Sequence, residues 1–253
     1  MKLPTILTIL TAGLALLGGA CSAEKTMIIC HRGLHHSLPE NSKEAMLAAW
    51  RAGFEWCECD VYLTTDGVAV LMHDAKLDRT TEAKGEIARR SWAELKDVRL
   101  KNPDGTLSDC RIPTLEETLA VMPPGCGMLV EIKPADHEAL VRETLRVCAG
   151  RKVIIQSFDE PDVAHSHRLA PGVPVHFLIG KAEHVDAAID GPWTHINFHQ
   201  KLVDAPLVER MKARGKSTGV WTVNDPLEIR RLLDLGIRRV ITDEPERVRA
   251  MAD

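Results

Sequence analysis

Short apolar runs alternate with amphipathic segments from residue 27 to the end of the chain. Eight of these runs have the length of a strand: 27–31, 55–60, 127–133, 152–157, 174–179, 195–198, 219–223 and 239–242. Segments between them repeat apolar residues at the helical period and begin near Ser, Thr, Asp or Pro, for example 42–53, 114–122, 137–150 and 226–236. Eight strands alternating with helices predict an α/β fold, the parallel (β/α)8 TIM barrel. A doubly wound sheet is disfavoured, because no Gly-rich dinucleotide turn follows the first strand.

One further apolar run, 67–74, breaks this alternation. It follows the second strand too closely for a helix to fit between them. The dipeptide Asp66-Gly67 between two apolar runs is typical of a β-hairpin with a two-residue turn. With that turn, Asp60 would lie opposite His73. The polar residues that follow, 75 to about 111, are expected to form an insertion at the barrel mouth without a core of its own.

The first twenty residues have the pattern of an export signal. Lys2 precedes an apolar run that ends in small residues just before Cys21. The run is short for a spanning helix and contains Pro4, so a transmembrane anchor is not expected. The small residues resemble a bacterial lipoprotein cleavage site, with Gly18 where leucine is usual. We therefore expect removal of residues 1–20 and a mature protein that is periplasmic or lipid-anchored at a bacterial membrane through Cys21, with plain secretion as the alternative.

The remaining chain, 21–253, is expected to form a single domain. The sequence of 253 residues is 45% hydrophobic and 27% charged, which suits one domain with a full core. Its formal net charge of −4 gives no basic surface for nucleic acid, so an anionic substrate would have to meet local positive charge. The oligomeric state is left open.

Seven cysteines are present, and their spacing resembles no zinc-binding pattern. Cys57 and Cys59 flank Glu58 on a predicted strand, so they should point to the opposite face from this carboxylate. We interpret them as small buried hydrophobic residues. Disulfides between the other cysteines remain open.

Polar side chains gather at the carboxyl ends of the predicted strands, where TIM barrels build their sites. They are His31 and Arg32 with Glu40 and Asn41 on the following loop, Glu58 and Asp60, His73 and Asp74, Glu131 and Lys133, Gln156, and Trp221 and Asn224. The other histidines near these strands, His35, His36, His165, His167, His184 and His199, are expected at the surface.

The acidic members of this set predict a metal site. Glu58, Asp60 and Glu131, with Glu40 close by, would place several carboxylates around one point, where they would repel each other and raise each other's pKa. A hard divalent cation such as Ca²⁺ or Mg²⁺ prefers oxygen ligands and would resolve this repulsion.

The basic members predict chemistry on a phosphate. His31 and His73, on opposite sides, are suited to accept and donate a proton near neutral pH. Arg32 and Lys133 supply positive charge, and a guanidinium can contact a phosphate at two points.

Each element alone also has an ordinary structural explanation. Glu58 and Asp60 could form an inward salt-bridge layer, Lys133 could neutralise Glu131, Asp74 could orient its loop, and Trp221 could pack in the core. Their convergence on one rim favours the functional interpretation.

At these residues the sequence resembles the glycerophosphodiester phosphodiesterase family. The matching stretches are HRG (31–33), PEN (39–41), ECDVYLTTDGVAVLMHD (58–74), LDRTT (77–81), IPTLEETL (112–119), VEIK (130–133), QSF (156–158) and WTVND…GIRRVITDEP (221–245). They span nearly the whole mature chain in the family's order. The resemblance implies a (β/α)8 barrel with a small insertion after the second strand. It also implies metal-dependent hydrolysis of glycerophosphodiesters, such as glycerophosphocholine or glycerophosphoethanolamine, to glycerol 3-phosphate and an alcohol.

Carried over onto this sequence, the resemblance implies a role for each member of the cluster. It makes His31 and His73 the acid–base pair and Glu58, Asp60 and Glu131 the metal ligands, and it places Arg32 and Lys133 at the phosphate. From their positions at the strand ends we also expect Trp221 to contact the substrate, and Glu40, Asn41, Asp74 and Gln156 to lie directly behind these residues. Two alternatives stay open: a phospholipase or lysophospholipase D that acts on acylated lipids, and a lipoprotein that binds phosphodiesters without cleaving them. Departures from the family pattern at His35, His36 and Cys59 leave the headgroup alcohol open.

Overall fold

The computed structural model describes residues 25–134 and 137–252, so the predicted export segment 1–20 and Cys21 lie outside the described residues. Eight parallel strands close into a barrel, since β1 pairs with β2 on one side and with β11 on the other. These strands are β1 (Met27–Cys30), β2 (Trp56–Leu63), β6 (Gly127–Ile132), β7 (Val153–Ser157), β8 (Val175–Ile179), β9 (His195–His199), β10 (Ser217–Trp221) and β11 (Arg239–Thr242). The predicted (β/α)8 barrel is confirmed, with strand ends that differ by a few residues.

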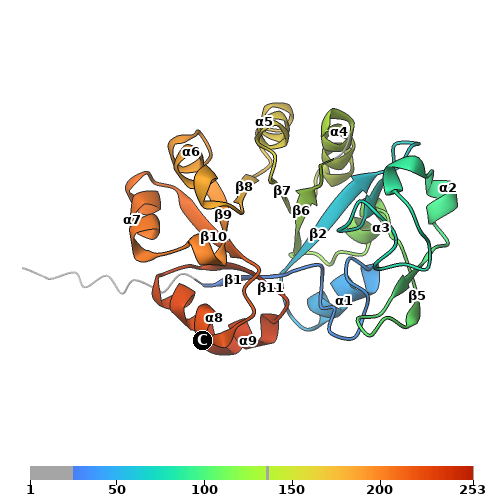
Figure 1. Cartoon of the computed structure of the whole chain (residues 1–253), viewed down its shortest axis with the longest axis horizontal. Coiled ribbons are helices and arrows are strands. Elements are labelled where there is room, and N and C mark those ends of the chain that lie inside the picture. Colours follow the sequence, from blue (N-terminus) through green and yellow to red (C-terminus); the bar gives the residue numbers. More distant parts are fainter. Residues whose placement is uncertain (1–24, 135–136, 253) are drawn as a thin grey trace, which may run out of the picture.

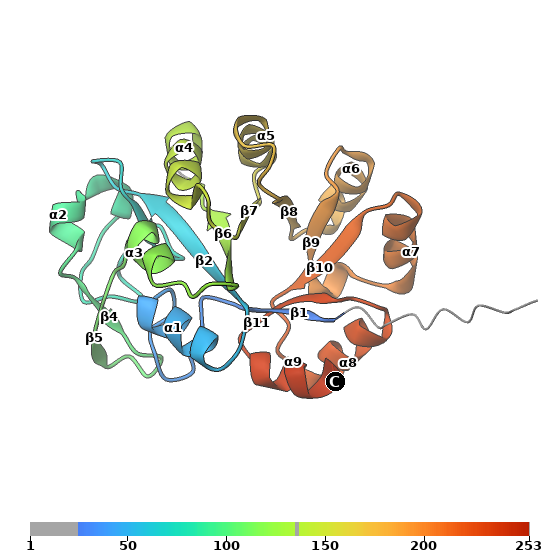
Figure 2. The same ribbon diagram turned by 180° about the vertical axis from the view of Figure 1, so that it is seen from behind.

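Helices surround the barrel on its outer side (Figures 1 and 2). They are α1 (Lys43–Arg51), α3 (Leu115–Ala120), α4 (His137–Cys148), α5 (Glu160–Leu169), α6 (Val185–Asp190), α7 (Ala205–Ala213), α8 (Pro226–Asp234) and α9 (Pro245–Ala252), with short 3₁₀ turns at Ala182–His184 and Gln200–Leu202. The sequence sets where they begin: the side chains of Ser42, Thr114 and Asp225 accept hydrogen bonds from backbone N–H groups of the first turn. Among the helices in the described residues, none is long and apolar enough to cross a membrane.

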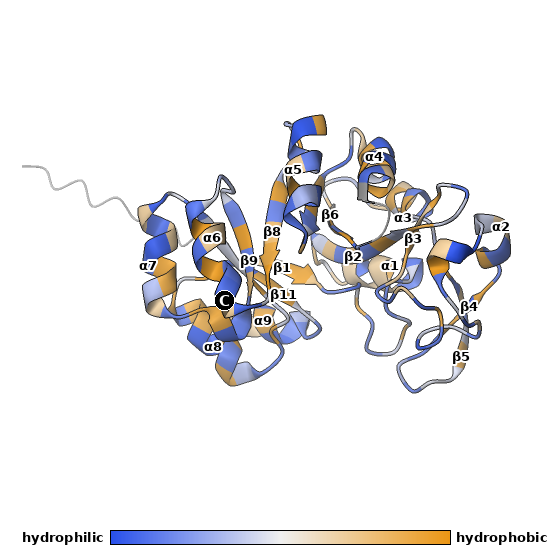
Figure 3. Cartoon of the chain, turned by 45° about the horizontal axis from the view of Figure 1, so that its top comes forward, coloured by the Kyte–Doolittle hydropathy of each residue, from blue (hydrophilic) through white to orange (hydrophobic). Residues whose placement is uncertain are grey.

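Two apolar regions hold the barrel together. The larger lies between the strands and the helices and consists of two clusters of buried residues. The helices contain both apolar and polar residues (Figure 3). The smaller lies inside the barrel and is built from Ile29, Leu129, Ile154 and Ile241. Each of these residues is followed two positions later, on the same inward face, by a polar residue. These polar residues are His31, Glu131, Gln156 and Asp243. The interior layer is therefore an apolar floor beneath a polar cluster at the carboxyl ends of the strands.

The cysteines on β2 lie on the outer face of the barrel. Cys57 and Cys59 are fully buried in the region between strands and helices, which agrees with their interpretation as small hydrophobic residues. All six cysteines in the described part of the chain are free thiols.

The hairpin that follows β2 has a different register from the predicted one. Its second strand is β3 (Ala69–Leu71), and the loop has three residues, 65–67, with Gly67 in the left-handed region at φ +79°. A three-residue loop with glycine at this position shifts the pairing by one, so Met72, not His73, lies opposite Asp60. His73 follows the end of β3, where the alternation of the ladder no longer fixes its direction, and it still faces the barrel mouth.

The insertion packs on an apolar cluster that it shares with β2 and β3, so it has no separate core. It contains the 3₁₀ turn Ile87–Arg89, α2 (Trp92–Leu95), β4 (Arg99–Lys101) and β5 (Leu107–Arg111), and it projects from the barrel on the side away from α7 (Figures 1 and 2). The cluster comprises Tyr62, Val70, Met72, Leu77, Ile87, Leu95, Leu100 and Ile112. Its members are widely spaced and partly supplied by β2 and β3, so they show no periodicity in the sequence.

Candidate active site

A cavity of about 130 Å³ opens at the carboxyl ends of the strands. It is lined by His31, Arg32, Glu58, His73, Glu131, Lys133, Gln156, Phe158, Leu178, Trp221, Thr222 and Ile241. Of the remaining predicted site residues, Glu40, Asp60 and Asp74 lie directly behind this lining and bond to it, and Asn41 bonds to Asp60. A larger cavity of about 650 Å³, at the other end of the barrel, has no histidine in its lining.

The three predicted metal ligands meet at this cavity. Asp60 and Glu131 are partners in the register of β2 and β6, and Glu58 precedes Asp60 on the same face. All three side chains are buried, and one oxygen of each lies within 4.8 Å of the others. Glu58 Oε1 is buried without a hydrogen-bond partner. An unpartnered buried carboxylate oxygen is costly, so this donor set fits a hard divalent cation.

The buried Lys133 and the half-buried Arg32 compensate only part of this negative charge. Lys133 Nζ lies 2.8 Å from Asp60 Oδ1 and 2.5 Å from Glu131 Oε1, and Arg32 Nε lies 3.3 Å from Asp60 Oδ2. Burial alone would raise the pKa of Asp60, but Lys133 and Arg32 outweigh burial and hold it below its ordinary value. Asp60 is therefore the permanently ionised member of the cluster.

The other two carboxyl groups are less well compensated. Burial, followed by the charges of Asp60 and Glu131, raises the pKa of Glu58 well above its ordinary value. Burial and the charge of Asp60 raise the pKa of Glu131 to about 7. Without a cation the cluster thus holds protons near neutral pH, whereas a bound divalent ion would favour its ionised form.

Each catalytic candidate histidine is held by an aspartate. His31 Nδ1 lies 2.7 Å from Asp243 Oδ1, and His73 Nδ1 lies 2.7 Å from Asp74 Oδ1. Burial lowers the pKa of both imidazoles, more than their aspartates raise it. Both rings are therefore neutral at pH 7, with Nδ1 fixed by a carboxylate and Nε2 left for chemistry in the cavity they line.

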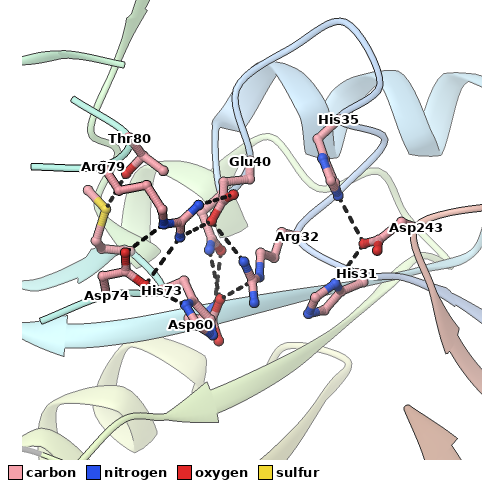
Figure 4. Close-up of polar contacts among 12 residues, drawn as sticks. His31, Arg32, His35, Glu40, Asp60, His73, Asp74, Arg79, Thr80 and Asp243 are labelled. Atoms are coloured by element: carbon pink, nitrogen blue, oxygen red, sulfur yellow. Dashed lines mark hydrogen bonds and ion pairs between the residues drawn. The ribbon is translucent and has the colours of Figure 1, made fainter. Parts of the chain in front are cut away.

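A chain of ion pairs ties the two sides of the mouth together (Figure 4). Arg79, from the insertion, donates to Asp74 Oδ2 at 2.6 Å and to Glu40 Oε2 at 2.7 Å. Glu40 Oε1 in turn accepts from Arg32 Nη1 at 2.9 Å. These contacts hold the pKa of Asp74 down at about 2, so Asp74 stays ionised behind His73. The position of Arg79 was not predicted, because the packing of the insertion brings it to Glu40, which is 39 residues away in sequence.

The loop after β1 needs unusual backbone geometry. Arg32 and Asn41 both have φ +55°, and Gly33 has φ +85°, where a Cβ would lie 2.7 Å from the backbone of α1. This geometry aims the backbone N–H of Arg32 at Glu58 Oε2, 3.1 Å away, and Asn41 Nδ2 at Asp60 Oδ2, 2.7 Å away. The HRG and PEN stretches are thus the two ends of a loop that hydrogen-bonds to the carboxylates of Glu58 and Asp60.

Asp243, which holds His31, was also not predicted as a site residue. It follows β11 and is 212 residues from His31 in sequence. Its Oδ2 accepts from Asn224 Nδ2 at 2.6 Å, and its Oδ1 also contacts His35 Nε2 at 3.0 Å. Two sequence features pointed to Asp243: its inward alternation two residues after Ile241, and its place in the stretch 221–245 that resembles the family.

The surface prediction for the remaining histidines holds in part. His36, His167 and His184 are exposed, whereas His35, His165 and His199 are half-buried. His199 and Phe158 each contact the Trp221 ring edge-to-face, with centroids 5.1 Å apart. Trp221 also donates from Nε1 to the carbonyl of Asn197 at 3.1 Å, so it forms a fixed apolar wall of the cavity.

Comparison with known proteins agrees with this geometry. The profile of the Glycerophosphoryl diester phosphodiesterase family matches residues 31–247. A glycerophosphodiester phosphodiesterase of Caldanaerobacter subterraneus subsp. tengcongensis is 30% identical, over 88% of this chain and 96% of the relative, and one of Bacillus altitudinis is 28% identical over the same shares. The solved structure of an Oleispira antarctica phosphodiesterase in complex with the product sn-glycerol-3-phosphate superposes with a TM-score of 0.80, at 26% identity, over 89% of this chain and 96% of that chain.

Proposed function

The chain belongs to the glycerophosphoryl diester phosphodiesterase family, and we propose that it hydrolyses small glycerophosphodiesters with the help of Ca²⁺ or Mg²⁺. Phosphodiesterase activity is common to the relatives compared, so the chain is an enzyme of this type. Glycerophosphocholine and glycerophosphoethanolamine are the proposed substrates, with glycerol 3-phosphate and the free alcohol as products. The observation that carries this proposal is the buried carboxylate cluster, with its unpartnered oxygen, beside two aspartate-held histidines.

Glu58, Asp60 and Glu131 would hold the divalent cation. When bound, it would polarise a phosphoryl oxygen and neutralise part of the developing negative charge. Lys133 spends two of its N–H bonds on Asp60 and Glu131, which leaves one for an anionic oxygen. Arg32 sits on the other side of Asp60 and lines the same cavity, so both cations are placed to bind the phosphate.

The two histidines would move the protons. His31, neutral and fixed through Nδ1, would accept at Nε2 the proton of the attacking hydroxyl, from water or from the substrate's glycerol. His73 would first take up a proton from solvent at Nε2, which makes it an imidazolium beside the ionised Asp74, and would then donate this proton to the leaving alkoxide as the P–O bond to the headgroup breaks. The side chain of His73 is 34% exposed and that of His31 17%, so His73 is better placed to regain its proton from solvent.

Incubation with glycerophosphocholine, with and without EDTA, tests this function. We expect release of glycerol 3-phosphate that stops on chelation and returns when Mg²⁺ or Ca²⁺ is added back. Release from lysophospholipid but not from glycerophosphocholine would instead support the acylated-lipid alternative. Tight binding of glycerophosphocholine without any product would support a binding protein. Neither alternative is favoured by the relatives, which are named as glycerophosphodiester phosphodiesterases.

We also propose that the enzyme is exported and held at a bacterial membrane through lipid on Cys21. The support is the sequence pattern of residues 1–20, which lie outside the described part of the chain. The intact mass of the protein purified from membranes tests this proposal. We expect the mass of a chain that starts at Cys21 and carries acyl chains. The mass of an unmodified mature protein would overturn the proposed lipid anchor.

A further inference from the structure

Beside the carboxylate cluster lies a second group of metal-ligating side chains, built from two imidazoles and one carboxylate. Asp243 Oδ1 lies 2.7 Å from His31 Nδ1 and 3.0 Å from His35 Nε2 (Figure 4). We propose that His31, His35 and Asp243 form a binding site for Zn²⁺, distinct from the Ca²⁺ or Mg²⁺ site, and that its occupation inhibits the enzyme.

The donor set fits zinc in type and spacing. Two histidines and one carboxylate, with a fourth position left for water, suit Zn²⁺, whereas the all-oxygen set of the carboxylate cluster suits harder ions. Tetrahedral zinc, with ligands at about 2.0–2.1 Å, separates its ligand atoms by about 3.3 Å. The three ligand atoms here lie within 4.8 Å of one another. The hydrogen-bonded contacts need to open by only a few tenths of an ångström to admit the ion.

The surrounding structure holds these ligands in place. Asn224 donates from Nδ2 to Asp243 Oδ2 at 2.6 Å and accepts at Oδ1 from the Asp243 backbone N–H at 2.9 Å. These two bonds fix both the carboxylate and the backbone of Asp243. The segment that carries both histidines is pinned by the Gly33 N–H to the Cys30 carbonyl. Such outer hydrogen bonds orient metal ligands and strengthen metal sites.

The site is also accessible and carries the appropriate charge. The side chains of His31, His35 and Asp243 are 17%, 23% and 29% exposed, so a cation can reach them and retain a water ligand. Asp243 supplies a negative charge. Arg32, whose charge acts on His31, is engaged by Glu40 (Figure 4).

Occupation would disable His31 through its tautomer. Zn²⁺ would take the lone pair of Nδ1, and the proton that Nδ1 shares with Asp243 would move to Nε2 of the neutral ring. Nε2 would then carry a hydrogen and could no longer accept a proton in the cavity. This consequence rests on the proposed role of His31 as the base, whereas metal binding itself does not.

Zinc binding to the purified protein, with Mg²⁺ in excess to fill the carboxylate cluster, tests the site directly. Calorimetric titration should show one Zn²⁺ per chain, and Co²⁺ in its place should give the visible absorption of a four-coordinate ion. His35→Ala should weaken Zn²⁺ binding by at least about 10–100-fold, because it removes a direct ligand. The matched variant His36→Ala changes the exposed neighbour and should bind as the parent does. Equal affinity in His35→Ala and the parent would overturn the site.

Activity and stability measurements separate this inference from the proposed function. In the same Mg²⁺ excess, the Zn²⁺ concentration for half inhibition should rise in His35→Ala by the same factor as the dissociation constant. Zn²⁺ should raise the melting temperature of the parent and of His36→Ala, but not of His35→Ala. Zinc binding that depends on His35 in a protein with no hydrolytic activity would overturn the function and keep the site. Normal hydrolytic activity that Zn²⁺ inhibits equally in His35→Ala and in the parent would overturn the zinc site and keep the proposed function.

Discussion

Replacing Glu131 by Gln should stabilise the metal-free protein at pH 8 and change it little at pH 5. Glu131 has an ordinary pKa of 4.5 when unfolded and a pKa of about 7 in the folded barrel. A folded-state pKa above the unfolded one means that stability is highest below about pH 4.5 and is lost as the pH rises toward 7. At 1.36 kcal/mol for each factor of ten in proton affinity, the loss amounts to about 3 kcal/mol. Gln cannot ionise, so the variant escapes this loss.

Other groups that titrate in this range do not obscure the effect. The pKa values of His31 and His73 are lowered on folding, so their contributions are lost as the pH falls below about 6.5, which is the opposite direction. Both proteins contain them, and the difference between variant and parent cancels them. Asp60, whose pKa is below 3.8, titrates outside the window. Removal of the Glu131 charge also lowers the pKa of Glu58, which adds to the expected gain.

Urea unfolding in EDTA at pH 5 and pH 8 provides the measurement. We expect Glu131→Gln to be more stable than the parent by about 3 kcal/mol at pH 8 and by less than about 1 kcal/mol at pH 5. Excess Mg²⁺ should then reverse the order at pH 8, because the ion stabilises the ionised cluster and the variant lacks one ligand. The same stability difference at both pH values in EDTA would refute the assignment of Glu131 as an undercompensated carboxylate.

Three further predictions follow from single contacts. His31→Ala and His73→Ala should each lower the rate of glycerol 3-phosphate release by about 10²–10⁴-fold while melting curves stay close to the parent's, and near-normal turnover in either would exclude the two-histidine scheme. Lys133→Met should cost about 3–5 kcal/mol in urea unfolding in EDTA, because it leaves two buried carboxylates without their shared cation; an unchanged midpoint would contradict this pairing. Gly33→Ala should lower the free energy of unfolding by more than about 2 kcal/mol and weaken metal binding, since its Cβ would collide with α1. The control Gly67→Ala has the same sign of φ but open space around it, and should lower the free energy of unfolding by about 1 kcal/mol. Equal losses at the two glycines would show that the collision is relieved.

The sequence was sufficient to predict the barrel and most of the cavity lining. A β-strand alternates its side chains, so Glu58 and Asp60 had to share a face, and the ends of parallel strands had to converge. This reasoning needs only local periodicity and the count of strands. It placed the carboxylates and His31 without knowledge of any contact between distant segments, whereas His73 lines the cavity although its predicted register was wrong.

The missed features depend on contacts that periodicity does not encode. The hairpin register was wrong by one because Gly67 permits a three-residue loop where a two-residue turn was expected. Arg79 lies in a polar insertion whose direction only packing fixes. The partnership of His35 with Asp243 joins opposite ends of the chain. Each of these features depends on the tertiary structure, so it cannot be predicted from local sequence patterns.

The contact of His31 with Asp243 depends on how the barrel closes. β1 and β11 pair in parallel with Ile29 beside Ile241 and Cys30 beside Thr242, so the next residues along, His31 and Asp243, leave the sheet at the same height. The His31 N–H also bonds to the Thr242 carbonyl at 3.0 Å, which extends this register to the proposed base. A slip of one residue would turn Asp243 to the outer face, because side chains alternate with a period of two. The register of β11, the last strand in the sequence, therefore sets the tautomer of the proposed base, because it places Asp243 beside His31.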